Sequence, residues 1–273
     1  MKKSIRTIAT VLLVLIFLFS TARFLGLQRD NAAGREVYSD ALALASSGKT
    51  ETAMPQITEA KMHPAQLQWV VAQPEEEDPY IRKLEELNLD ALREINPQVV
   101  GWILIPDTEI SYPLMQGADN DYYLKRTWDQ QRNDVGSIFL EQYSSPDLTD
   151  FNTIVYGHNM KDGSMFAGLQ SYRDQSHWEA HPFVYIRSDY GVYRYEIYSS
   201  YLAAVDSATY GLAFPGEDAR NHFLEHTTQS SVIRTGVQPE LTDRILTLST
   251  CSGAGYTTRW VVHARLKMVQ EQP

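Results

Sequence analysis

The pattern of apolar residues along the chain changes near residue 80 and again near residue 98. Over 80–95 the apolar positions recur at helical spacing, and Asn96-Pro97 follows them as a stop signal. These positions are Ile81, Leu84, Leu87, Leu89, Leu92 and Ile95. We therefore predict a helix over 80–95 that packs on the domain following it.

Beyond residue 98 the apolar residues occur in short runs, rich in β-branched and aromatic side chains and separated by turn signals such as Pro106-Asp107. These runs predict strands over 99–105, 110–115, 136–140, 151–156, 183–187, 191–204, 244–249 and 260–268. We predict short helices around 120–125, 165–172 and 219–226. Many short strands with few helices in one domain are typical of a barrel or a sandwich.

The N-terminus has a third pattern, in which basic residues precede the apolar run 8–19. This order indicates export, with the basic end left in the cytoplasm. Two interpretations stay open. The small residues 20–22 provide a signal-peptidase site, or the segment 5–27 spans the bilayer uncleaved while Arg23 snorkels to the outer interface. On either interpretation, residues from about 30 onward lie outside the cytoplasm.

The chain is accordingly predicted to have three parts. Residues 1–29 form a signal segment or membrane anchor. Residues 30–79 form an extracytoplasmic stem, because Ala, Ser, Gln and Glu dominate there and hydrophobic periodicity is weak. Residues 80–273 form the folded domain.

Composition narrows the possible functions. The 273 residues include 34 acidic and 24 basic side chains, a net charge of −10, whereas nucleic-acid binding needs clustered Lys and Arg. We therefore expect no nucleic-acid partner. The chain has neither a glycine-rich phosphate loop nor zinc-ligand spacing, so we also predict no cofactor and no metal site.

One residue, Cys251, is the single cysteine of the chain. In an exported protein it cannot form an internal disulfide, so it is a buried apolar side chain, an intermolecular link or a reactive thiol. It follows the apolar run 245–250 and precedes Gly253-Ala254-Gly255, which places the thiol at the end of a predicted strand beside a loop. That position favours the reactive thiol.

A reactive thiol needs a cation or base beside it, because the thiolate is the nucleophile. Arg259 lies eight residues after Cys251, where a hairpin would bring it back beside the thiol and let it stabilise an oxyanion. His158 follows Gly157 at the end of the predicted strand 151–156 and is the candidate general acid and base. A surface Arg at the end of a strand is the alternative for Arg259.

The other histidines are weaker candidates. His222 and His226 are one turn apart on a predicted helix, which suits metal binding, but no third ligand is evident and two solvated side chains are the better interpretation. His263 lies inside a predicted strand, where a structural role is favoured. The remaining three are His63, His177 and His181.

The residues around Cys251 and His158 resemble the signature of class B sortases. The matching strings are Thr247-Leu248-Ser249-Thr250-Cys251 with Arg259, Val155-Tyr156-Gly157-His158-Asn159-Met160, Gly163-Ser164-Met165-Phe166, Gly101-Trp102-Ile103, Tyr112-Pro113-Leu114, Asp119-Asn120, Tyr123-Leu124 and Gly136-Ser137-Ile138-Phe139-Leu140. The resemblance covers roughly residues 80–269.

This resemblance implies a mainly β fold, a closed eight-stranded sortase-type barrel with an N-terminal helix and short peripheral helices. It implies a membrane-anchored cysteine transpeptidase whose catalytic domain is extracellular. Such an enzyme cleaves a C-terminal sorting motif of secreted proteins after Thr, forms a thioester and transfers the protein to a peptidoglycan-precursor amine. By resemblance, Cys251 is the nucleophile, His158 the general acid and base, and Arg259 the group that stabilises the oxyanion.

The resemblance also implies a substrate groove. Its predicted residues are Asn120, Leu124, Ser249, Thr250 and Tyr210. The chain departs from the family beside the nucleophile, where Ser252 replaces a frequent acidic residue and the loop 252–258 is short. The alternatives that stay open are a sortase that polymerises pilins through a lysine acceptor, a simple hydrolase, and an inactive wall-binding module.

Overall fold

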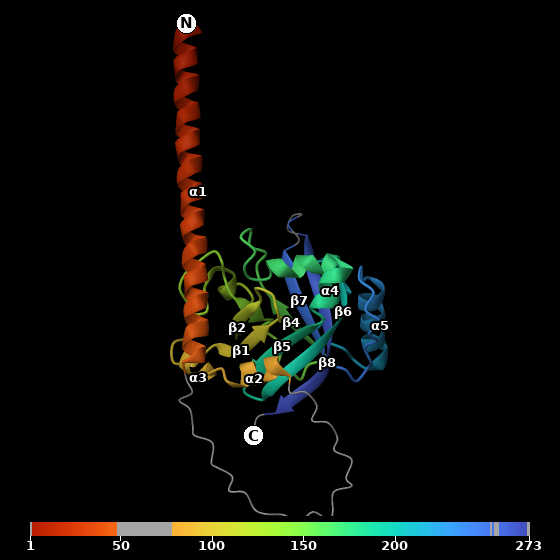
Figure 1. The fold of residues 1–273 in the computed structure, drawn as a ribbon. Helices are drawn as coiled ribbons and strands as arrows, with labels where there is room; N and C mark the ends of the chain where they lie inside the picture. Colours follow the sequence, from red (N-terminus) through yellow and green to blue (C-terminus); the bar gives the residue numbers. More distant parts are fainter. Residues whose placement is uncertain (1, 48–77, 252, 254–256, 272–273) are drawn as a thin grey trace, which may run out of the picture.

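The computed structural model describes residues 2–47, 78–251, 253 and 257–271, with only the backbone described for 2–11 and 27. Its centre is a closed barrel with the strand order β1-β2-β3-β4-β7-β8-β6-β5 (Figure 1). The strands are β1 (Val99–Leu104), β2 (Ser111–Met115), β3 (Ile138–Leu140), β4 (Asn152–Tyr156), β5 (Phe183–Ser188), β6 (Gly191–Ala204), β7 (Ile245–Cys251) and β8 (Thr258–Glu271). The predicted eight-stranded barrel is confirmed.

Two of the eight strand contacts are parallel, β2 with β3 and β4 with β7, and the others are antiparallel. The strands lie close to the predicted runs, but β7 and β8 are longer. β7 pairs along its whole length with residues 259–265 of β8, from Ile245↔Arg265 to Cys251↔Arg259, and β8 also pairs with β6 from Gly191↔Glu271 to Ala204↔Thr258. Backbone pairing extends them, because a ladder continues for as long as the neighbouring strand offers hydrogen-bonding groups.

The predicted single helix over 80–95 is wrong in one respect, because it is broken into α2 (Pro79–Glu85) and α3 (Leu89–Arg93). Each piece has its own N-cap, since the Asp78 side chain accepts from the amide of Tyr80 and the Asn88 side chain from that of Ala91. The apolar spacing still marks the face packed on the barrel. Its buried members are Ile81, Leu84, Leu87, Leu89 and Leu92.

A long helix, α1 (Lys2–Ser46), stands along one side of the barrel. Its C-terminal part packs on the barrel through the buried side chains of Tyr38, Ala41 and Ala45. Its N-terminal part projects away from the barrel (Figure 1). The predicted stem 30–79 is therefore helical from its start up to Ser46, while 48–77 lies outside the described residues. The three predicted parts of the chain stay a prediction.

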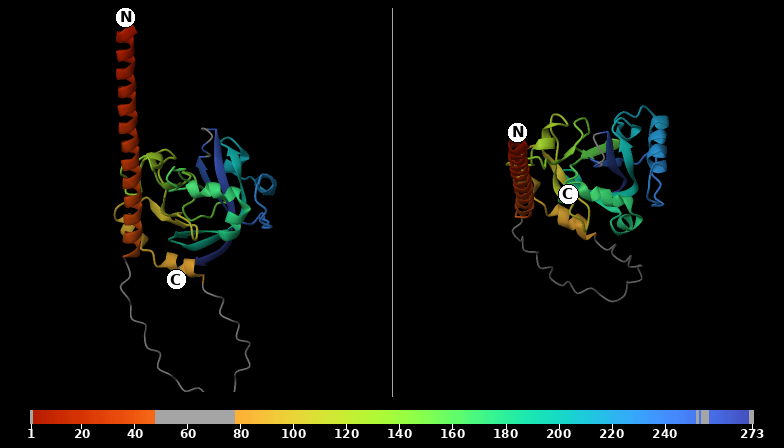
Figure 2. Two further views of the ribbon diagram at one scale, coloured as in Figure 1. Left: turned by 45° about the horizontal axis from the view of Figure 1, so that its top comes forward. Right: turned by 90° about the horizontal axis from the view of Figure 1, so that it is seen from above.

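Short helices surround the barrel, as predicted. They are η1 (Tyr122–Lys125), η2 (Ala167–Arg173), α4 (Gln175–Ala180), η3 (Ala208–Tyr210) and α5 (Glu217–Gln229). Seen from above, α1 and α5 lie on opposite sides of the barrel (Figure 2).

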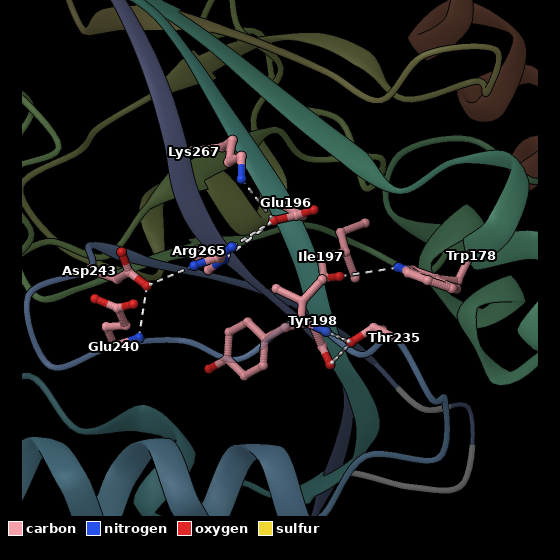
Figure 3. A network of polar contacts seen from close by, with 10 residues as sticks. Trp178, Glu196, Ile197, Tyr198, Thr235, Glu240, Asp243, Arg265 and Lys267 are labelled. Atoms are coloured by element: carbon pink, nitrogen blue, oxygen red, sulfur yellow. Dashed lines mark hydrogen bonds and ion pairs between the residues drawn. The ribbon is translucent and has the colours of Figure 1, made fainter.

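A polar network fastens the connection between α5 and β7 to the barrel (Figure 3). Arg265 on β8 lies between two carboxylates, 3.1 Å from Glu196 on β6 and 3.6 Å from Asp243 just before β7. The Thr235 hydroxyl donates to the carbonyl of Tyr198 at 3.1 Å. These contacts hold the chain that leads into β7, so that the strand carrying Cys251 starts from a constrained position.

Candidate active site

Strand pairing brings Cys251, His158 and Arg259 to one rim of the barrel. Strands β4 and β7 run parallel with Tyr156 opposite Ser249, so both strands end at the same rim. The Gly157 amide continues this pairing by donating to the Ser249 carbonyl at 3.1 Å, and His158 follows directly. On the other side of β7, Cys251 is paired with Arg259 of β8.

A pocket of about 280 Å³ opens at this rim. It is lined by Asn120, Asp121, Leu124, Phe139, Tyr156, Gly157, His158, Ser249, Thr250, Cys251 and Arg259. The predicted groove residues Asn120, Leu124, Ser249 and Thr250 are all in the lining. Tyr210 lies beside it, because its hydroxyl is 2.9 Å from that of Ser249 and its ring stacks on Tyr156 with centroids 6.5 Å apart.

The pKa of the half-buried Cys251 thiol is lowered. Hydrogen bonding to His158 is the main cause, and the positive charge of Arg259 acts in the same direction. Burial opposes both by disfavouring the charged form, but the lowering prevails. Cys251 is therefore a better thiolate former than an isolated cysteine.

The pKa of His158 is raised, first by its hydrogen bond to Cys251 and also by the Leu124 carbonyl, against the effect of burial. Its Nε2 atom is 2.7 Å from that carbonyl oxygen. Because a carbonyl can only accept, Nε2 carries a proton, and Nδ1 is the nitrogen left to exchange a proton with the thiol. The backbone of η1 thus sets the tautomer.

Two side chains that the sequence analysis did not single out hold the backbone of Cys251. The side-chain amides of Asn159 and Gln170 both donate to its carbonyl oxygen at 2.9 Å. Asn159 directly follows His158, so its position was a usable signal. Gln170 belongs to η2, and no pattern in the sequence of η2 predicts its contact with the Cys251 carbonyl.

A buried carboxylate, Glu141, contacts two side chains of the pocket lining and was also missed. It accepts hydrogen bonds from the Asn120 amide and, at 3.0 Å, from the Tyr156 hydroxyl. Burial, together with this nearby negative charge, raises the pKa of Tyr156, which therefore stays neutral. Glu141 thus orients two lining side chains.

The other histidines in the described residues are not part of the pocket lining. His263 is fully buried between Thr247 at 2.9 Å and Tyr201 at 3.1 Å, and burial lowers its pKa to about 3. It is a neutral part of the core, as predicted. His222 is exposed on α5, and no cluster of metal-ligating side chains occurs among the described residues. His63 lies outside them.

Comparisons with known proteins agree with this arrangement. The family model "Sortase domain" matches residues 103–267. Sortase B of Listeria monocytogenes is 41% identical over 160 residues, which are 59% of this chain and 65% of that relative. Sortase B of Staphylococcus aureus is 34% identical over 174 residues, 63% of this chain and 71% of that relative. The chain thus matches just under two thirds of the length of the Listeria protein.

Solved structures of sortase B are also similar to this chain. The S. aureus sortase B–substrate complex has a TM-score of 0.63 and 33% identity, covering 66% of this chain and 85% of that one. Sortase B from B. anthracis in complex with AAEK1 has a TM-score of 0.69 and 29% identity, covering 89% of this chain and 99% of that one.

Proposed function

This chain belongs to the sortase family, and its matched relatives are of class B; from that premise we propose that it is a cysteine transpeptidase of secreted proteins. In this proposal it cleaves a C-terminal sorting motif after Thr and transfers the protein to the amine of a peptidoglycan precursor. The observation that carries the proposal is the meeting of Cys251, His158 and Arg259 at one pocket.

The first half of the proposed reaction forms a thioester. The Cys251 thiolate attacks the carbonyl carbon of the threonine, and Arg259 stabilises the negative charge that develops on the carbonyl oxygen. When the tetrahedral intermediate collapses, the peptide C–N bond breaks. The His158 imidazolium then gives its Nδ1 proton to the leaving amine, while Nε2–H stays on the Leu124 carbonyl.

The second half returns the enzyme to its starting state. The neutral His158 imidazole takes a proton from the incoming amine as that amine attacks the thioester carbonyl. The C–S bond breaks, and the thiolate–imidazolium pair is restored. One peptide bond is broken and one is formed, so no cofactor is required.

We also propose that α1 anchors the enzyme in the cell membrane, with the catalytic domain extracellular. Leu12–Phe19 have side chains 51–70% exposed, so no surface among the residues that the structure describes covers this apolar segment. The helix is long and apolar enough to cross a bilayer. The end of β7 that carries Cys251 lies on the side toward which α1 projects (Figure 1), which supports access to substrates held at a membrane. Residues 80–273 would then be the catalytic domain.

Cys251→Ala tests the nucleophile. The full chain is incubated with sorting-signal peptides, and the covalent adduct and released fragment are measured by mass spectrometry. Wild type is expected to show both, and Cys251→Ala neither. His158→Gln should lower turnover by about a hundredfold or more, the usual contribution of general acid–base catalysis.

The matched control is His222→Gln, an exposed histidine on α5, which should cleave at the wild-type rate. Cleavage by Cys251→Ala at the wild-type rate would overturn the proposal. The acceptor is identified in three parallel reactions, which contain a peptidoglycan-type amine, a lysine-bearing pilin peptide or water alone. The mass of the product shows which of them resolved the thioester. A peptide that binds wild type but is never cut would indicate an inactive binding module.

A further inference from the structure

Tyr38 makes one of the contacts by which the helix α1 meets the catalytic rim. Its hydroxyl donates to the Gly136 carbonyl at 2.5 Å and lies 3.1 Å from the Ser137 hydroxyl. Tyr38 is 98 residues from Gly136 in the chain and only 8% exposed. The contact is therefore a buried tertiary hydrogen bond between α1 and the turn before β3.

The Gly136 turn packs directly against the catalytic histidine. Its φ of +64° is in the left-handed region that favours glycine. A methyl group placed on Gly136 would lie 2.8 Å from Cδ2 of His158 and 2.9 Å from the Leu124 carbonyl oxygen. A side chain at this position would therefore collide with both the imidazole edge and the carbonyl that accepts from Nε2, so the turn fits against them only with glycine.

The same turn holds the chain that carries this carbonyl. The Ser137 amide donates to the Tyr123 carbonyl at 2.9 Å, and the Ser137 hydroxyl donates to that of Arg126 at 2.8 Å. A shift of the Gly136 turn would therefore move the Leu124 carbonyl and also change the space available to the His158 imidazole ring.

A second path leads from Tyr38 to the other side of His158. The Tyr38 ring meets that of Tyr112 edge to face, with centroids 5.2 Å apart. The Tyr112 hydroxyl accepts from the Met165 amide at 2.9 Å, and the neighbouring Phe166 amide donates to the His158 carbonyl at 2.9 Å. Tyr38 is thus connected to His158 by two routes, through its hydroxyl and the Gly136 turn, and through its ring and Tyr112.

The position of Tyr38 is itself constrained along α1. Gly34, Tyr38, Ala41 and Ala45 form one buried stripe at helical spacing, and a methyl group on Gly34 would lie 2.7 Å from Val135. The Trp128 indole also donates to the Val37 carbonyl at 3.0 Å. Small residues let the helix approach closely at the points that flank Tyr38.

We propose that Tyr38 is a positioning residue for the catalytic histidine, through which docking of the N-terminal helix sets the orientation of His158 and its tautomer. This inference rests on the proposed roles of His158 and Cys251. Removing the Tyr38 hydroxyl frees the Gly136 turn and weakens the contact between the Leu124 carbonyl and Nε2–H. The imidazolium is then less stabilised, so less Cys251 thiolate forms at neutral pH.

The test uses the full chain in detergent or vesicles and compares wild type with Tyr38→Phe, which keeps the ring and loses the hydroxyl. The rate of Cys251 alkylation by iodoacetamide is followed against pH, together with kcat and KM for a sorting-signal peptide. We expect Tyr38→Phe to lower alkylation at pH 7 and kcat by about fivefold, the effect of losing one net hydrogen bond. KM should be unchanged, and the alkylation midpoint should move to higher pH.

Two controls separate positioning from general destabilisation. Tyr80→Phe removes an equivalent hydroxyl from α2, bonded to Asp107 on the surface, and should leave both profiles unchanged. In a His158→Gln background, Tyr38→Phe should have no further effect on the alkylation midpoint, because its action passes through the histidine. An alkylation profile of Tyr38→Phe equal to wild type would overturn the proposal, as would an equal shift in the His158→Gln background.

The alkylation assay needs no sorting-signal substrate. A chain that fails to cleave such peptides but shows the shift in Tyr38→Phe would contradict the proposed function and support the positioning role. If wild type and Tyr38→Phe cleave these peptides at equal rates, the result would support the proposed function and contradict the positioning role.

Discussion

Cys251 and His158 change each other's ionisation more than their shared burial does. Burial alone would raise the thiol pKa and lower the imidazole pKa, which favours the neutral pair. Their mutual hydrogen bond reverses both directions, and Arg259 adds to the effect on the thiol. The pocket therefore shifts the equilibrium toward a thiolate beside an imidazolium, the pair that the proposed reaction begins and ends with.

The pH dependence of thiol alkylation should report this pair. Because the pKa of Cys251 is lowered, its reactivity with iodoacetamide should persist below the ordinary thiol range near pH ~8.5 and decline only at lower pH. His158→Gln removes the main cause of the lowering, so the midpoint should move upward toward that range. The exposed-residue variant His222→Gln serves as control. A midpoint unaffected by His158→Gln would refute the coupling.

At the scale of elements, α2 is joined to two strands through its N-cap. Asp78 accepts from the Tyr185 hydroxyl on β5 at 2.6 Å and from Arg194 on β6 at 3.1 Å, while capping α2 through Tyr80. Burial raises the pKa of Asp78, but these hydrogen bonds outweigh it and the pKa is lowered overall. The carboxylate therefore fixes the helix that follows the predicted stem onto the barrel.

Asp78→Ala should lower the free energy of unfolding by about 2 kcal/mol, from the lost cap and the unpaired Arg194. Because the folded pKa is depressed, the ionised carboxylate stabilises the fold above the ordinary Asp pKa of ~3.9. This contribution is lost as pH falls through the folded value. Urea unfolding of wild type and variant should therefore converge in acid.

Asp90→Ala is the matched control, because Asp90 pairs with Arg93 on the surface of α3 and is 90% exposed. Its loss should cost less than about 1 kcal/mol. Equal destabilisation by both variants would contradict the role given to Asp78.

At the scale of the whole molecule, α1 has two different halves. The C-terminal half is buried against the barrel through its stripe of small residues and Tyr38, whereas the apolar side chains of Leu12–Phe19 are 51–70% exposed among the described residues. A single continuous helix joins them, so the orientation of the barrel would follow the direction of the proposed anchor. This coupling is the basis of the proposal that the catalytic rim is turned toward the membrane.

Placing two lysines in the apolar half tests the anchor. Val14→Lys with Phe17→Lys should release the full chain from vesicles into the soluble fraction, because each charge at the centre of a span costs about 2.5–3.5 kcal/mol. Ser39→Lys with Leu42→Lys adds the same charge to exposed positions of the docked half and should leave the chain membrane-bound. Retention of the first variant in the sedimented vesicles would refute the anchor.

Local sequence patterns were sufficient to locate the strands and the candidate residues that follow them. Alternation of apolar runs and turn signals located all eight strands, since each strand is marked by its own residues. The break between α2 and α3 was missed; there the Asn88 side chain caps α3, and the Asn88 backbone amide donates to the Ala45 carbonyl of α1 at 2.8 Å. Periodicity cannot detect a contact with a segment more than 40 residues away.

The sequence alone determined the chemical types at the rim: one thiol, a histidine after a strand and an arginine after a short loop. It also determined the family, because those residues stand in a specific local order. Only the tertiary structure decided how they meet, through the parallel pairing of β4 with β7 and the pairing of Cys251 with Arg259. It alone revealed the supports from Gln170, Glu141 and Tyr38, because such contacts depend on the three-dimensional path of the chain and leave no periodic trace.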